Sequence, residues 1–205
     1  MKKVVLIIVL CALYTAPALA DMMITVADSG VGSTNGGEFT VTVTGDPIGN
    51  FYDNTPPNNT LGTFCLETAE YLNYGTTYFV TLSDYSIKGR YTLPPYDPLD
   101  PMTAWIYTQW LNNNLAHDDA TADAVQNAIW YIEGEGGSTN QLVTDAQLAI
   151  KDGWVNTDIK VMNLWGNAAH TDYKQDLLVR VPLPGAVLLG VLGLSIAGLK
   201  LRKYT

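Results

Sequence analysis

Two apolar stretches, one at each end of the chain, leave only the segment between them to fold in water. At the amino end, two lysines precede the apolar run 4–13, and the small residues Ala18 and Ala20 stand just before Asp21. This order is typical of a secretory signal peptide, and the run is shorter than the about 20 residues that a membrane-spanning helix needs. We therefore expect residues 1–20 to be a signal peptide that is cleaved after Ala20.

The second apolar stretch, residues 185–199, lies close to the carboxyl end and contains no charged residue. At about 1.5 Å per helical residue it spans roughly 23 Å, which is short for a bilayer but enough for an anchor. Basic residues follow it, and such residues favour the cytoplasmic side of a membrane. Residues 21–180 would then lie outside the cytoplasm, in agreement with the signal peptide. We expect a single C-terminal transmembrane helix that anchors the exported domain in the inner membrane.

The residues around this stretch resemble the PEP-CTERM sorting signal of exported proteins. They combine a proline pair, a glycine-rich apolar segment and a terminal basic cluster, and they are Val181, Pro182, Leu183, Pro184, Gly185, Lys200, Arg202 and Lys203. Leu183 stands where the family usually has glutamate. The resemblance implies that an exosortase, an integral membrane cysteine transpeptidase, recognises segment 181–205, removes it and passes the protein to the cell surface or extracellular matrix. An ordinary single-span tail anchor is the alternative.

The segment between the two ends has about 160 residues, which suits one domain with its own hydrophobic core. All 20 acidic residues of the chain lie in it, and the net charge of the whole chain is −9. Its basic residues are Lys88, Arg90, Lys151, Lys160, Lys174 and Arg180. A field of this sign repels phosphate backbones, so we expect no nucleic acid partner.

Local patterns divide this domain into a strand-rich part (21–92), a helical part (101–152) and closing strands (157–181). Phe39 and Val41, for example, alternate with threonines, as in a strand with one buried face. The predicted strands cover residues 24–26, 39–44, 63–67, 77–82, 158–164 and 175–181. The predicted helices, where apolar residues recur at helical spacing, cover residues 102–115, 119–133 and 140–152. The sequence thus predicts an α+β fold, a β-sandwich-like domain with a helical insert.

Cys65 is the one cysteine that remains after signal-peptide removal, since Cys11 lies within that peptide. An unpaired cysteine in an exported protein is either a buried core thiol or a reactive group. Cys65 lies on a predicted strand, and Gln126 begins the sequence Gln-Asn-Ala-Ile-Trp in a predicted helix. This arrangement resembles the thioester domains of bacterial surface adhesins, in which a strand cysteine pairs with the glutamine of a Thr-Gln-x-Ala-Ile-Trp motif. Val125 replaces the threonine here.

The resemblance implies a covalent bond between Cys65 and Gln126. The Cys65 sulfur would attack the side-chain carbonyl of Gln126 and expel ammonia, which leaves an internal thioester held together by proximity. An amine-bearing surface would then open the thioester, and the protein would become fixed to it by an amide. In the alternative interpretation, Gln126 is a polar helix residue and residues 128–130 pack in the core.

Other polar groups indicate less. His117 and His170 lie far apart without a helical histidine pair, so we expect no metal site and no cofactor. Three acidic residues, Asp118, Asp119 and Asp123, surround a predicted helix start, where capping explains them better than calcium does.

Two further acidic pairs stay open on sequence alone. Asp97 and Asp100 lie among prolines without the spacing of a known calcium loop. Glu133 and Glu135 flank Gly134, but glycosidase chemistry depends on the separation of two carboxylates across a cleft, which sequence spacing does not give.

Five tryptophans and twelve tyrosines complete the functional signals. Aromatic faces stack on sugars as well as in protein cores, so a carbohydrate-binding or hydrolytic surface module is the alternative function. The interpretation that we favour is a non-enzymatic, tail-sorted cell-surface or matrix protein, associated with biofilm or exopolysaccharide. In that interpretation its partners are an exosortase-type transpeptidase, the inner membrane as a transient anchor, and a polysaccharide matrix or an amine-bearing surface.

Overall fold

The computed structural model describes residues 21–33, 37–45, 59–88 and 97–181. Six strands form one antiparallel sheet in the spatial order β3-β2-β1-β4-β7-β8. Their bounds are β1 (Met23–Asp28), β2 (Phe39–Gly45), β3 (Thr60–Thr63), β4 (Thr77–Ser83), β7 (Ile159–Trp165) and β8 (Tyr173–Arg180). Two short strands, β5 (Tyr85–Ser86) and β6 (Asp97–Pro98), pair with each other in a separate ribbon.

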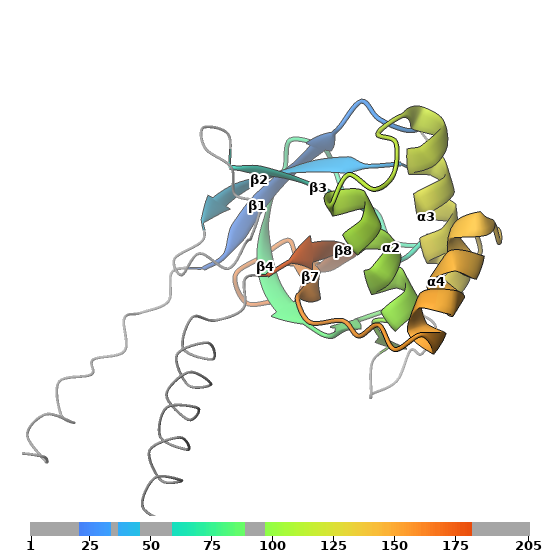
Figure 1. The fold of residues 1–205 in the computed structure, drawn as a ribbon. Helices are drawn as coiled ribbons and strands as arrows, with labels where there is room; N and C mark the ends of the chain where they lie inside the picture. The colour runs from blue at the N-terminus through green and yellow to red at the C-terminus, as the bar shows by residue number, and fades with distance from the viewer. Residues whose placement is uncertain (1–20, 34–36, 46–58, 89–96, 182–205) are drawn as a thin grey trace, which may run out of the picture.

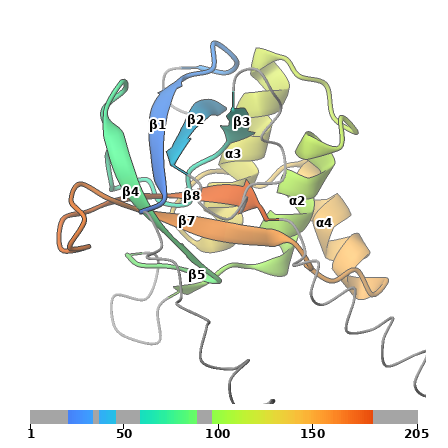
Figure 2. The same ribbon diagram turned by 90° about the vertical axis from the view of Figure 1, so that its left-hand side faces the viewer.

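The large sheet curls until its two ends meet. Strands β1, β2 and β3 stand steeply across β7 and β8 (Figure 2). Directly after β3, the chain pairs with β8: the Leu178 N–H donates to the Phe64 carbonyl at 3.1 Å, and the Leu66 N–H donates to the Asp176 carbonyl at 3.1 Å. Cys65 forms the bridge between these two bonds, opposite Leu177. We call residues 64–67 the seam segment, because they close the sheet onto its last strand.

Strands β7 and β8 are buried on both faces. Met162 and Leu177 pack into the cluster enclosed by the curled sheet, which also contains Cys65. Val161 and Leu178 point to the opposite face and pack against the helices. Side chains alternate along a strand, so two buried faces produce a run of consecutive buried residues in place of an alternating pattern.

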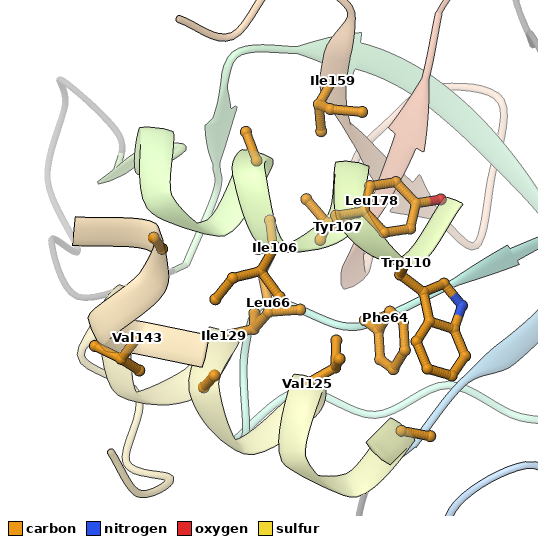
Figure 3. Close-up of a cluster of buried hydrophobic side chains, with 14 of the residues drawn as sticks. Phe64, Leu66, Ile106, Tyr107, Trp110, Val125, Ile129, Val143, Ile159 and Leu178 are labelled. Atoms are coloured by element: carbon orange, nitrogen blue, oxygen red, sulfur yellow. The ribbon is translucent and has the colours of Figure 1, made fainter. Parts of the chain in front are cut away.

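Three helices between β6 and β7 cover the outer face: α2 (Pro101–Leu111), α3 (Asp119–Glu133) and α4 (Gln141–Lys151) (Figure 1). Each begins at a side chain that accepts a backbone N–H of its first turn, from Asp100, Asp118 and Asn140 respectively. The helix α3 ends at Gly134, whose φ of 77° is the left-handed conformation that glycine adopts without strain. Phe64 and Trp110, with ring centroids 5.2 Å apart, lie in the cluster between sheet and helices (Figure 3).

Every predicted helix, and every predicted strand except 63–67, lies on an observed element, whereas 63–67 shares only Thr63 with β3 and is otherwise the seam segment. The helix 119–133 has the expected bounds. The fold class predicted from them is wrong. The described chain is mostly β-sheet with a few helices, and its long strands form one sheet that encloses a cluster by curling, not two sheets packed as a sandwich. Alternating apolar residues reveal a buried face but not which strands lie across from it, so the pattern alone fits either arrangement.

The fold class also included a C-terminal transmembrane helix, which is not found among the described residues. Among the described residues, no helix combines the length and apolar character that a bilayer crossing requires. Residues 185–199, on which that expectation rests, lie outside the described residues, as does the expected signal peptide 1–20.

Candidate functional site

The seam segment brings Cys65 against the side chain of Gln126 from α3. Gln126 Oε1 lies 3.4 Å from the Cys65 sulfur and accepts the Cys65 backbone N–H at 3.2 Å. In return, Gln126 Nε2 donates to the Cys65 carbonyl at 2.8 Å. Both side chains are buried, Gln126 completely. The structure therefore places the two residues singled out in the sequence in direct contact, although 61 positions separate them.

Strand geometry explains why Cys65 faces this way. Phe64 and Leu66 point to the helices, so Cys65 and Glu67 point to the other side of the seam segment. On α3, Gln126 and Trp130 are one helical turn apart and both approach the cysteine. The Cys–Gln contact thus follows from two periodicities: side chains on one face recur every two residues along the seam segment and about every four residues along α3.

The Cys65 thiol is not acidic in this environment. Burial raises its pKa to about 12, and a negative charge on Glu67 would raise it further. The Trp130 indole N–H lies beside the sulfur without ideal hydrogen-bond geometry and partly offsets this rise in the pKa. A thiol with this pKa is protonated at neutral pH, so any reactivity of Cys65 must come from its contact with Gln126 and from proton transfer by its neighbours.

The Gln126 amide is held in a chemically suitable orientation. Its oxygen accepts the Cys65 backbone N–H, which would stabilise negative charge on that oxygen during attack by the sulfur. Its nitrogen is bound to the Cys65 carbonyl, so the amide has one defined orientation. This arrangement can support an acyl transfer from nitrogen to sulfur within the protein.

A pocket of about 460 Å³ opens onto Cys65. It is lined by aromatic and acidic residues from the seam segment, the following loop and neighbouring strands: Phe39, Cys65, Glu67, Thr68, Glu70, Tyr71, Leu72, Tyr74, Trp130 and Gln175. Tyr71 and Tyr74 remain 79% and 56% exposed. A small nucleophile therefore has a route to the sulfur side of the Cys–Gln contact, past two exposed aromatic rings.

Two buried acidic residues lie near Cys65: Glu67, which lines the pocket, and Asp176, which contacts Glu67. Glu67 is 1% exposed; Tyr173 donates to its Oε1 at 2.6 Å and the Asp176 N–H donates to its Oε2 at 2.9 Å. Asp176 is completely buried and accepts hydrogen bonds from the Ile87 N–H at 2.6 Å and from Asn163 Nδ2 at 2.9 Å. Burial raises the pKa of both carboxyls, and their mutual repulsion raises that of Glu67 further.

Sequence analysis missed these two acidic residues as site residues. A signal was present, because Asp176 directly precedes the apolar run Leu177 to Val179 and Glu67 lies two positions after the cysteine. A carboxylate in a strand with two buried faces is costly unless it is hydrogen-bonded. That Glu67 and Asp176 belong to one site follows only from the pairing of β8 with the seam segment.

The remaining candidates have structural roles. Asp118 caps α3, and Asp119 and Asp123 accept the backbone N–H groups of Gly32 and Ser33 at 3.0 and 2.7 Å. Hydrogen bonding to Thr121 lowers the pKa of Asp118, as expected for a cap. Among the described residues, no group of three or more histidine, cysteine and acidic side chains is placed to hold a metal ion.

The two histidines are far from each other and pack on tryptophans. His117 stacks on Trp110 with ring centroids 4.0 Å apart, and His170 lies 5.5 Å from the Trp165 ring. They lie on different sides of the fold and share no site.

Glu133 and Glu135 have different hydrogen-bond partners. Glu133 is buried at the end of α3 and accepts the Asp100 N–H at 3.3 Å. Burial raises its pKa to about 7, and the charges of Asp100 and Asp97 contribute to this rise. Glu135 accepts the Thr68 hydroxyl through its backbone carbonyl. Asp100 itself caps α2 and accepts the Met102 N–H at 2.8 Å.

Most residues of the expected targeting signals lie outside the described residues. These are Ala18, Ala20, Pro182, Leu183, Pro184, Gly185, Lys200, Arg202 and Lys203. Val181 is described; its N–H donates to the Asp158 carbonyl at 2.8 Å, and its side chain packs against the enclosed cluster. The domain therefore extends up to the residue at which the expected sorting signal begins.

Comparison of the chain with protein-family models, with curated proteins and with solved structures found no match in any of the three.

Proposed function

We propose that this protein is an exported surface or matrix protein that carries an internal thioester between Cys65 and Gln126. The observation that carries the proposal is the buried contact of 3.4 Å between the Cys65 sulfur and the Gln126 side-chain oxygen. The same amide also satisfies the buried backbone N–H and carbonyl of Cys65, so its contact with the sulfur comes in addition to a structural role. The reciprocal hydrogen bonds support the proposal because they hold the amide in one orientation beside the sulfur.

In this proposal the protein acts once and does not turn over. The thiol attacks the Gln126 carbonyl carbon, the carbon–nitrogen bond breaks, and ammonia leaves. A primary amine entering through the pocket then attacks the same carbonyl, the carbon–sulfur bond breaks, and the thiol is restored. The product is an amide that fixes the protein to the amine-bearing surface, for example a component of the extracellular matrix.

Export and sorting belong to the same proposal. A covalent anchor is useful at the cell surface. Residues 1–20, as a signal peptide, and residues 181–205, as a sorting segment recognised by an exosortase, would deliver the protein there. The strong excess of acidic residues fits a protein outside the cell. The inner membrane would be a transient location, and the cell surface or exopolysaccharide matrix the final one.

The test is the intact mass of freshly purified mature protein. A thioester lowers the mass by about 17 Da, because one ammonia is lost, and incubation with methylamine then adds about 31 Da. The matched controls are Cys65→Ala and Gln126→Ala, which should show neither change. The thioester would be rejected if the mature wild-type protein had the mass calculated from its sequence, without loss of ammonia, and did not react with methylamine.

A carbohydrate-binding module is the second candidate, because Tyr71 and Tyr74 are exposed at the mouth of a pocket that also contains Glu70. Exposed aromatic rings beside acidic and amide groups suit sugar binding. Cys65→Ala distinguishes the two functions: it abolishes covalent attachment, whereas reversible binding to oligosaccharides would persist.

A further inference from the structure

Glu67 is a buried acid that the Cys–Gln chemistry described above does not use. It lies on the same side of the seam segment as Cys65 and lines the same pocket. Its carboxyl is held from two directions, by the Tyr173 hydroxyl at 2.6 Å and the Asp176 N–H at 2.9 Å. Gln175 completes the arrangement, since its Nε2 donates to the Glu67 carbonyl at 2.8 Å.

Burial and the neighbouring charge indicate which carboxyl carries a proton. Asp176 accepts from the Ile87 N–H and from Asn163, so its charged form is stabilised. Glu67 accepts two hydrogen bonds as well, but burial and the nearby Asp176 charge outweigh them and raise the pKa of Glu67 to about 9. At neutral pH the proton of the pair therefore resides on Glu67, which is a neutral acid beside Cys65.

The chemistry of thioester formation needs such an acid. Attack of the thiol on an amide gives a tetrahedral intermediate that carries both sulfur and nitrogen. The sulfur leaves readily as thiolate and restores the amide, whereas the nitrogen leaves only after it has been protonated. Without a proton donor the intermediate returns to the starting amide.

We infer that neutral Glu67 donates the proton that allows the Gln126 nitrogen to leave as ammonia. The inference rests on the proposed thioester. The atoms balance: the thiol proton passes to the Glu67 carboxylate, the Glu67 proton passes to the nitrogen, and one ammonia leaves for each carbon–sulfur bond formed. The pocket that Cys65 and Glu67 share has room for a water molecule to relay the proton and for ammonia to depart.

The charged surroundings of Glu67 keep the proton in place. The titratable groups near it are Cys65 and Asp176, the Tyr173 hydroxyl, and the ion pair of Lys88 with Glu70 at 2.8 Å. Lys88 lies over the Tyr173 ring, 4.9 Å from its centroid. The Asp176 anion favours the neutral acid, whereas the hydrogen bond that Tyr173 donates favours the carboxylate and offsets only part of the rise in the Glu67 pKa.

The experiment measures the rate of ammonia loss. Mature chain is unfolded in urea before it reacts, refolded by dilution, and sampled by intact mass as the about 17 Da loss appears. Glu67→Gln keeps the size and hydrogen bonds of a neutral acid but holds no transferable proton, so the loss should slow about 100-fold or more. Asp152→Asn is the control: it removes an exposed carboxyl that does not line the pocket and should leave the rate unchanged.

The pH profile separates proton donation from a structural role. In the wild type the rate should fall as alkaline pH removes the Glu67 proton. In Asp176→Asn the fall should move to lower pH, because the neighbouring anion that keeps Glu67 protonated is gone. This shift also tests the inference if Glu67→Gln does not fold.

Three results would overturn the inference. One is a Glu67→Gln chain that folds and loses ammonia as fast as Asp152→Asn, and another is a rate that is independent of pH through the alkaline range in the wild type. The third is a wild type that never loses ammonia, and this one identifies the proposed thioester, not the proton donor, as the error.

Discussion

At the scale of single residues, burial determines the chemistry of the charged groups. Glu67, Asp176 and Glu133 are each less than one-tenth exposed, and burial is the first cause of the rise in the pKa of each. Each is held by hydrogen bonds and not by a cation. Such groups favour the protonated state, so the folded domain takes up protons that the unfolded chain releases.

Glu133 gives a prediction on pH and stability. Its pKa is raised to about 7 in the folded state, so between pH 4.5 and 7 the folded chain holds a proton that the unfolded chain has lost. The free energy of unfolding should therefore fall as pH rises through this range. Glu133→Gln, which can still accept the Asp100 N–H, should be more stable than the wild type by about 3 kcal/mol at pH 8.

Urea unfolding at several pH values measures this difference. At pH 4 the variant and the wild type should be equally stable, because Glu133 is then protonated in both states. A constant difference across the whole pH range would instead point to altered packing at the end of α3.

At the scale of elements, the position of Gln126 depends on how α3 is held against its surroundings. The turn after α3 folds back onto the helix, and an added Cβ at Gly137 would lie 2.3 Å from the Asn127 carbonyl and 2.9 Å from the Tyr131 nitrogen. These are backbone atoms in the turns that carry Gln126 and Trp130. The close approach of glycine thus helps to set where the helix presents its amide to Cys65.

Gly137→Ala should be clearly destabilising, because it combines a positive φ of 66° with a steric clash against helix backbone. The control is Gly75→Ala, where φ is 74° and a Cβ meets nothing within 4 Å. The control should lose about 1 kcal/mol from backbone strain alone, and Gly137→Ala about 2–3 kcal/mol. Thermal or urea unfolding compares the two variants. Equal losses in the free energy of unfolding would show that the turn at Gly137 can shift to accommodate a Cβ.

At the scale of the whole molecule, β8 joins the two apolar clusters. Leu177 is part of the enclosed cluster and Leu178 part of the cluster under the helices, and both are completely buried. The chain therefore folds around two cores that share a strand, and we expect them to unfold together in one transition.

Leu177→Ala and Leu178→Ala should each lower the free energy of unfolding by about 2–5 kcal/mol, since each leaves a cavity in a different cluster. Val155→Ala, at a side chain that is 69% exposed, should change it little. Urea unfolding followed by both tryptophan fluorescence and circular dichroism measures the loss. If one leucine variant were as stable as Val155→Ala, or if the two probes gave separate transitions, the shared-core description would be wrong.

Much of the local structure was predictable from the sequence. The helix 119–133 and the strands around Phe39, Tyr78 and Leu164 follow from short-range periodicity, capping residues and glycine positions. The choice of Cys65 and Gln126 as a pair was also made from sequence, because one lone cysteine and one helix motif stood out.

Tertiary structure alone decided how these pieces meet. The seam segment pairs with β8 across more than a hundred residues, which turns the expected sandwich into one curled sheet and brings Glu67 and Asp176 beside the Cys–Gln contact. Local periodicity indicates which face of an element is apolar. Strand order and the residues that surround a buried acid depend instead on contacts between distant segments. Sequence therefore determined the elements and the two candidate reacting groups, and the fold determined their surroundings.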